Sequence, residues 1–169
     1  MPIDLKDITD AVQAYLNNKV AVTITDLSPA EGDHVNPGET FKVSVEAKNA
    51  GSASGGVALA NVKYRLSIDD GSVAKLLVPT DPFLHTTDLD GNPVVEGSER
   101  TSMIVQKTFF TKLPVGQSAT LVVDGKASKS ADGGKTSVRA RVLADVDLVE
   151  LFPQGEDTPV ATKSLAVTG

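Results

Sequence analysis

Residues of alternating polarity make up much of the chain after residue 19, with apolar and polar side chains following one another at a period of two. This period places all the apolar side chains of a run on one face of an extended backbone, as in a β-strand with one buried and one solvated face. Val and Thr, which favour strands, occupy many of the positions. The alternating runs lie at residues 20–24, 41–47, 62–68, 119–123 and 138–144.

Turn-forming residues separate the runs, and no helical period interrupts them. A further strand is predicted at 103–111. Several short strands joined by turns are typical of an all-β protein, and we predict an immunoglobulin-like antiparallel β-sandwich of about seven to eight strands. The predicted turns are Asn36-Pro37-Gly38, Asn49-Ala50-Gly51, Asp69-Asp70-Gly71, Asp90-Gly91-Asn92, Asp124-Gly125 and Asp132-Gly133-Gly134.

The first 19 residues follow a different period and predict one short amphipathic α-helix. A helix of this length is marginal alone in water, so its apolar stripe is expected to pack against another surface. Two interpretations remain open: the stripe covers the end of its own domain, or it inserts into a neighbouring subunit. We therefore expect a helix at 1–19 and a sandwich at 20–169 with an insertion at about 79–100. The stripe consists of Leu5, Ile8, Val12, Tyr15 and Leu16.

Composition excludes several kinds of chemistry in this chain of 169 residues. The absence of Cys rules out disulfides, thiolate metal sites and cysteine nucleophiles. The net charge of −6 and the lack of Trp argue against nucleic-acid binding. Neither a secretory signal nor an apolar run long enough to span a membrane is present. We expect a cytoplasmic protein or a component of a particle assembled inside the cell, and an extracellular one if an export signal was removed.

Several segments resemble the bacterial CARDB ("cell adhesion related") domain, a relative of immunoglobulin-like and fibronectin type III sandwiches. The resemblance extends over roughly residues 20 to 168 and consists of turn and core features, which bear on fold more than on function. It implies a non-catalytic spacer or interaction module. The segments are Val22–Pro29, Val35–Val45, Lys48–Ser52, Leu113–Leu121, Gly134–Asp145 and Ala161–Val167.

The chain departs from the CARDB pattern in its N-terminal segment, its 79–100 insertion and its last loop, and it has no export signal. These departures favour a subunit of a prokaryotic or phage assembly, such as a phage or phage-tail-like particle, with protein partners in a homo- or hetero-oligomer. The alternatives are a bacterial adhesion or cell-surface module that binds calcium and a carbohydrate-binding sandwich. The shortage of aromatic residues disfavours the last of these.

A run of acidic and amide side chains forms a candidate calcium site in the insertion. Asp88, Asp90, Asn92 and Glu99 occupy positions one, three, five and twelve of a loop with calcium-ligand spacing. However, the glycine falls at the fourth position rather than the sixth, and no helical pattern flanks the run. The alternative is a polar turn with an Asp-Gly hairpin signal. We expect no cofactor apart from this candidate calcium.

Catalytic motifs are missing from the sequence. His34 and His85 lie in predicted loops with no metal-ligand spacing, and neither a Gly-x-Ser-x-Gly nor a His-Glu-x-x-His motif occurs. The expectation is that the chain is not an enzyme and has no catalytic residues.

Two surfaces are candidates for partner binding besides the N-terminal stripe. If the strands at 61–68 and 136–144 are neighbours, Lys63, Arg65, Arg139 and Arg141 share one outer face, which could bind an acidic partner or simply be solvated. The second candidate is the apolar pair Leu151 and Phe152 in the last loop, which could instead pack into the core.

Overall fold

The computed structural model describes residues 20–28, 34–50, 58–108, 112–130, 133–146, 156–157 and 161–167. Within these ranges the secondary structure consists of strands and turns. The strands are β1 (Val20–Ser28), β2 (His34–Val35), β3 (Thr40–Asn49), β4 (Leu59–Ile68), β5 (Ala74–Leu77), β6 (Leu84–Thr87), β7 (Glu99–Arg100), β8 (Ser102–Lys107), β9 (Ser118–Ala127), β10 (Lys135–Val146), β11 (Glu156–Asp157) and β12 (Ala161–Val167).

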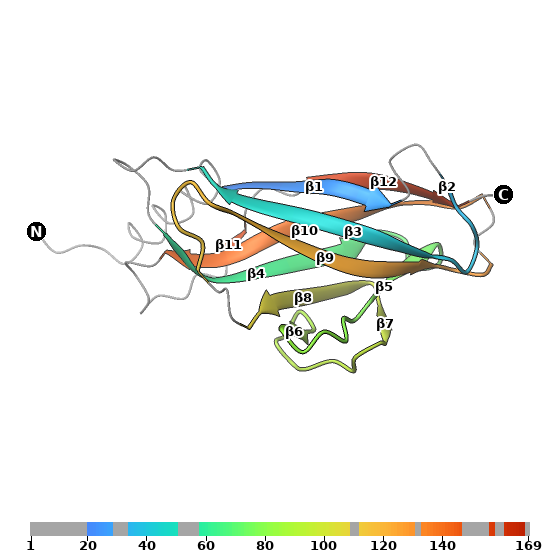
Figure 1. The fold of residues 1–169 in the computed structure, drawn as a ribbon. Helices are drawn as coiled ribbons and strands as arrows, with labels where there is room; N and C mark the ends of the chain where they lie inside the picture. The colour runs from blue at the N-terminus through green and yellow to red at the C-terminus, as the bar shows by residue number, and fades with distance from the viewer. Residues whose placement is uncertain are drawn as a thin grey trace, which may run out of the picture.

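The strands form two sheets that pack face to face (Figure 1). One has five strands in the order β1-β3-β9-β5-β7. The other has seven, in the order β2-β12-β10-β4-β8-β6, with β11 paired to β10. All pairings are antiparallel except that of β2 with β12. This strand order, with β1 in one sheet and β2 in the other, is that of an immunoglobulin-like sandwich.

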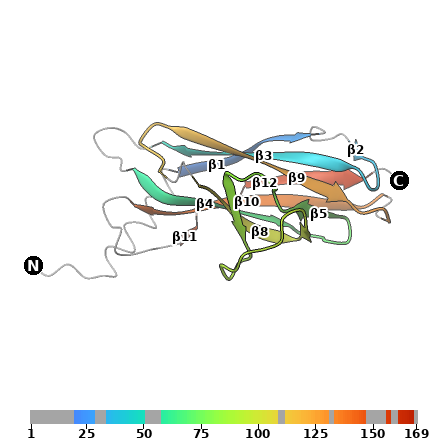
Figure 2. The same cartoon turned by 60° about the horizontal axis from the view of Figure 1, so that its bottom comes forward.

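The segment from β5 to β8 crosses between the two sheets at one edge of the sandwich. β5 and β7 belong to the five-stranded sheet, whereas β6 and β8 belong to the seven-stranded one. Figure 2, in which this edge comes forward, shows the segment lying against both layers. It extends the seven-stranded sheet beyond β4 and thereby widens its outer face.

The core lies between the sheets and consists of the inward-facing residue of each alternating pair. Phe41 of β3, Tyr64 and Leu66 of β4, and Met103 of β8 are at most 2% exposed. The burial pattern of β3 alternates along the whole strand. Burial of these apolar side chains stabilises the sandwich without disulfides.

The predicted strands at 20–24, 41–47, 62–68, 119–123 and 138–144 are confirmed, and the predicted fold class is correct for the described residues. The strand predicted at 103–111 is observed from Ser102 to Lys107, and residues 109–111 lie outside the described residues. The described residues form twelve strands rather than seven or eight, because the prediction omitted short strands of two to four residues. The predicted turn at Asp124-Gly125 is wrong, since both residues lie inside β9. The predicted N-terminal helix lies outside the described residues.

Raising the pH from 10 to 12 is expected to destabilise the protein by about 2 kcal/mol through Tyr64 alone. The Tyr64 hydroxyl is buried and has no hydrogen-bond partner, and burial raises its pKa from 10.0 to about 12. In this pH range the unfolded chain releases the phenolic proton and the folded chain keeps it, so stability falls as pH rises. Urea unfolding of the wild type and Tyr64→Phe at pH 9 to 12 measures the effect. An equal loss of stability in both proteins would contradict it.

Candidate binding face

The outer face of the seven-stranded sheet carries the predicted basic cluster. β4 and β10 are antiparallel neighbours, as the sequence predicted. Lys63 and Arg139 are exposed, and Arg65 and Arg141 are partly buried. All four lie at alternate positions whose neighbours along the strand point into the core. We call these four residues the basic face.

Two arginines of the basic face stand directly opposite each other. Arg65 and Arg141 are register partners in the β4–β10 ladder. Like charges directly opposite in neighbouring strands destabilise a sheet. Arg139 has a counter-ion, since its Nε lies 2.8 Å from Oδ1 of Asp69, and this hydrogen bond raises the pKa of the guanidinium. The pair is about half exposed, so it contributes little to stability.

A groove of about 490 Å³ continues the basic face toward β6. Lys63 and Leu143 line its end next to the arginines. The opposite wall is the loop after β6, where Leu89 is 44% exposed. The groove therefore combines cationic and amide groups with apolar contacts. Its other lining residues are Asn61, His85, Thr87, Asp90, Gly91, Ile104, Gln106 and Ala144.

A β-bulge shapes one end of the groove. The β4–β10 register advances by three residues in β4, from Ala60 to Lys63, but by two in β10, from Asp145 to Leu143. Asn61 lies in this bulge with a φ of 53°. Asn tolerates this left-handed conformation better than most residues, which explains why it occupies the position. The bulge bends β4 and turns the Asn61 side chain into the groove wall.

The loop from Asp88 to Asn92 is a tight turn stabilised by its own first carboxylate. Oδ1 of Asp88 accepts hydrogen bonds from the backbone N–H groups of Asp90, at 2.9 Å, and of Asn92, at 3.0 Å. The Asp88 N–H donates to the Asn92 carbonyl at 2.9 Å. The Asn92 N–H is the main cause of a pKa of Asp88 below the usual range. This geometry is that of the polar turn which the sequence offered as the alternative to a calcium loop.

The structure does not bring the four candidate calcium ligands together. Asp88 and Asp90 lie in the turn after β6, whereas Glu99 begins β7 in the other sheet. No three His, Asp or Glu side chains among the described residues are placed to hold a metal ion together. His85 lies on β6 and lines the groove, and His34 lies on β2, although both were predicted in loops.

The remaining predicted partner-binding residues lie outside the described residues. They are Leu5, Ile8, Val12, Tyr15 and Leu16 of the N-terminal segment and Leu151 and Phe152 of the last loop.

Sequence reasoning missed the groove itself. The lining residues from β6 and β8 lie in or beside the insertion, where the alternation is short. Met103 and Val105 are buried whereas Ile104 and Gln106 are only partly buried, but the sequence does not mark this alternation, because Met103, Ile104 and Val105 are all apolar.

No helix of the length and apolarity needed to cross a membrane occurs in the described ranges.

No family model matches the sequence, and no curated protein matches it. Solved structures do resemble the fold. AvmM, which catalyses macrocyclization in alchivemycin A biosynthesis, superposes with a TM-score of 0.52 at 14% identity over 90% of both chains. A protein from Corynebacterium diphtheriae, described as a candidate membrane-anchored protein, gives 0.54 at 8% identity over 90% of this chain and 36% of its own. The sixth cohesin of Acetivibrio cellulolyticus scaffoldin B gives 0.46 at 12% identity over 89% and 96%.

These likenesses are below 25% identity and concern the fold alone. The strand order identifies the described residues as an immunoglobulin-like β-sandwich.

Proposed function

We propose that this chain is a non-catalytic interaction module that binds an acidic segment of a protein partner on the basic face and the adjoining groove. The observation that carries the proposal is the direct opposition of Arg65 and Arg141 in the β4–β10 ladder. Like charges opposite each other in neighbouring strands disfavour a sheet, and a carboxylate bound at Arg65 would bring a counter-charge to this position.

The chemistry of the face suits a peptide with both acidic and apolar side chains. Arginine forks bind carboxylates with two parallel hydrogen bonds, which fixes the orientation of the partner as well as its position. In the groove, Leu89 and Leu143 offer apolar contacts beside the Lys63 ammonium group. On a chain with a net charge of −6, a local cationic face also directs an acidic partner to one place.

Larger assemblies are the proposed setting of this interaction. The resemblance to CARDB domains supports a structural or spacer role, and we propose a subunit of a phage or phage-tail-like particle that is assembled in the cytoplasm. A calcium-dependent adhesion module is the alternative. The Asp88 carboxylate oxygen that would bind calcium already accepts two backbone hydrogen bonds, which weighs against this alternative. For a carbohydrate-binding sandwich, neither Phe, Tyr nor Trp lines the described groove.

Reversing one charge tests the proposal, because it should change stability and binding in opposite directions. Arg65→Glu places a carboxylate opposite Arg141, so we expect a free energy of unfolding about 0.5 kcal/mol higher than that of the wild type. Affinity for a fluorescein-labelled decaglutamate peptide should fall about tenfold. Thermal unfolding and fluorescence anisotropy at low salt measure the two effects.

Lys48→Glu is the matched control, because Lys48 is an exposed cation inside β3 of the other sheet. It changes the net charge by the same amount and should alter peptide affinity less than twofold. Equal losses of affinity in the two variants would mean that the peptide responds to net charge alone, and the proposal would then be wrong. Unchanged affinity in Arg65→Glu would also refute it.

A further inference from the structure

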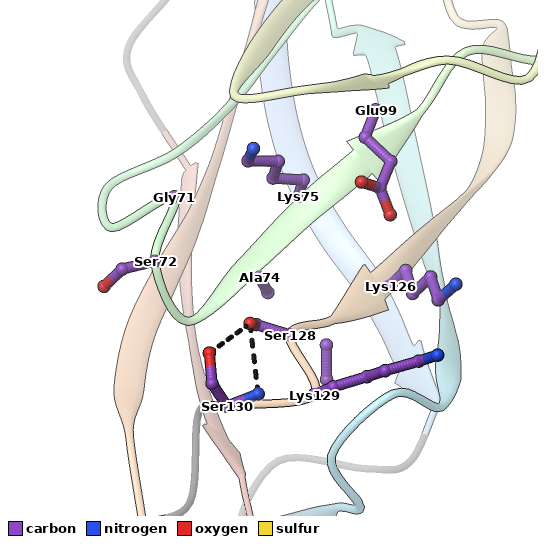
Figure 3. A pocket seen from close by; sticks show the side chains of 10 residues that line it. Gly71, Ser72, Ala74, Lys75, Glu99, Lys126, Ser128, Lys129 and Ser130 are labelled. Carbon is purple, nitrogen blue, oxygen red and sulfur yellow. Dashed lines mark hydrogen bonds between the residues drawn. The ribbon is translucent and has the colours of Figure 1, made fainter.

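We infer that a second site, on the five-stranded sheet, binds a phosphate group. A hollow of about 450 Å³ opens where β5 and β9 pair, and three lysines line it: Lys75, Lys126 and Lys129 (Figure 3). Its volume falls within the range of small-molecule sites. The basic face lies on the other sheet, so this inference does not depend on the proposed function.

Among the described residues, the three ammonium groups have no salt-bridge partner. Lys75 and Lys126 are register partners in the β5–β9 ladder, so two like charges stand directly opposite each other. Across the described part of the chain, no salt bridge or side-chain hydrogen bond involves any of the three lysines. Figure 3 shows the ammonium ends of Lys126 and Lys129 pointing to the same side of the hollow. A multivalent anion would neutralise several of these charges at once.

Two glycines lie beside lysines of the hollow: Gly38 beside Lys129 and Gly71 beside Lys75. A Cβ at Gly38 would lie 3.2 Å from Cγ of Lys129, so the lysine stem packs against this turn. Gly38 also has a φ of 80°, which other residues adopt at a cost. A Cβ at Gly71 would lie 2.6 Å from Cγ2 of Thr101 and 3.8 Å from Cε of Lys75. The turn at Gly38 therefore restricts the stem of Lys129, whereas the backbone at Gly71 is close to Thr101 and in ordinary contact with Lys75.

Hydroxyl groups add donors to the floor of the hollow. The Ser128 and Ser130 hydroxyls are 3.1 Å apart, and the Ser130 N–H donates to Oγ of Ser128 at 3.3 Å. In that pair only one hydroxyl proton is used, so the other can donate to a ligand. Ammonium and hydroxyl donors together favour a ligand rich in acceptor oxygens, and a phosphate group is such a ligand.

Glu99 is the one carboxylate among the residues that line the hollow. It begins β7 and extends into the hollow above Lys126 in Figure 3. Its negative charge repels an anion, so it should weaken phosphate binding and not support it. This opposite sign makes Glu99 a useful internal probe of the site.

Pyrophosphate titration of the full-length ¹⁵N-labelled chain at constant ionic strength, followed by amide chemical shifts, tests the inference. We expect saturable shifts that centre on Gly71, Ser128 and Ser130, with a dissociation constant below about 10 mM. Lys126→Met should weaken binding about tenfold, and Glu99→Gln should strengthen it about threefold. Lys42→Met, which removes an exposed cation from the same sheet, should leave the affinity unchanged.

Several results would overturn the inference: shifts that do not saturate, shifts spread over the surface, or equal losses in Lys126→Met and Lys42→Met. A parallel titration with adenosine diphosphate separates a phosphate site from a nucleoside site. If both ligands bind with similar affinity, the inference is supported. It is also supported if adenosine diphosphate binds more tightly than pyrophosphate, provided that pyrophosphate binds in its own titration. Binding of the nucleotide without binding of pyrophosphate refutes it.

Discussion

Gly125→Ala is expected to lower the free energy of unfolding by about 3 kcal/mol, although it adds a single methyl group. Gly125 lies inside β9, two residues before its end, and is the register partner of Phe41 in β3. A Cβ at this position would lie 2.3 Å from Cζ of Phe41 and 2.5 Å from its Cε2. The ring is 2% exposed, so it cannot move away without disturbing the packed core.

A double-mutant cycle assigns this cost to the ring. In the Phe41→Leu background the methyl group has more space, so Gly125→Ala should cost less than about 1 kcal/mol there, which gives a coupling of about 2 kcal/mol. Urea unfolding of the four proteins measures the coupling. If the alanine costs the same in both backgrounds, the effect comes from the backbone and not from contact with Phe41.

Asn49→Asp should destabilise the protein by about 3 to 5 kcal/mol at pH 7. Asn49 is fully buried at the end of β3, and its Nδ2 donates to the Leu113 carbonyl at 3.1 Å. Its backbone also bonds to the next loop: its N–H donates to the Gln117 carbonyl, and its carbonyl accepts from the Gly116 N–H. The near-isosteric carboxylate would replace the amide donor with a buried charge facing a carbonyl oxygen.

The pH dependence of this variant identifies the cause. Burial and the facing carbonyl would raise the pKa of the new carboxyl group above its unfolded value, so its destabilisation should diminish as pH falls below that raised pKa and be smallest at and below about pH 4, the unfolded value. Chemical unfolding of Asn49→Asp and the wild type at pH 4 and pH 7 tests this. Asn49→Leu, which removes the hydrogen bond without adding a charge, should show no such pH dependence. A loss in Asn49→Asp that is equal at both pH values would contradict the explanation.

The basic face was predictable from sequence, because alternation assigns a strand residue to one face whatever its partners are. Arg139 and Arg141 had to share a face with each other, and Lys63 with Arg65. The pairing of β4 with β10 came from the expected sandwich topology, and the structure confirms it. What alternation could not provide was the register, which sets Arg65 opposite Arg141 and not beside it.

Gly125 shows where local sequence misleads, and Asp88 shows where it leaves two interpretations open. Asp-Gly is a strong turn signal, yet at residues 124 and 125 it continues a strand, because the Phe41 ring needs the space that a side chain would fill. At residues 88 to 92 the sequence left a calcium loop and a polar turn open, and in the structure the Asp88 carboxylate accepts backbone N–H groups of its own turn. A side chain distant in sequence, Phe41, explains the glycine at position 125. Hydrogen bonds within the turn itself explain the arrangement of Asp88.

Sequence alone determined the all-β class and the two faces of each long strand, because both depend on the alternation of apolar and polar residues along the chain. Tertiary structure decided the rest. The groove is formed by residues from four strands and a loop, and the lysine hollow by β5, β7 and β9 with their turns. These sites depend on register, on the β4 bulge and on the crossing of the 79–100 segment between sheets. Such features follow from packing between distant residues, which no local period records.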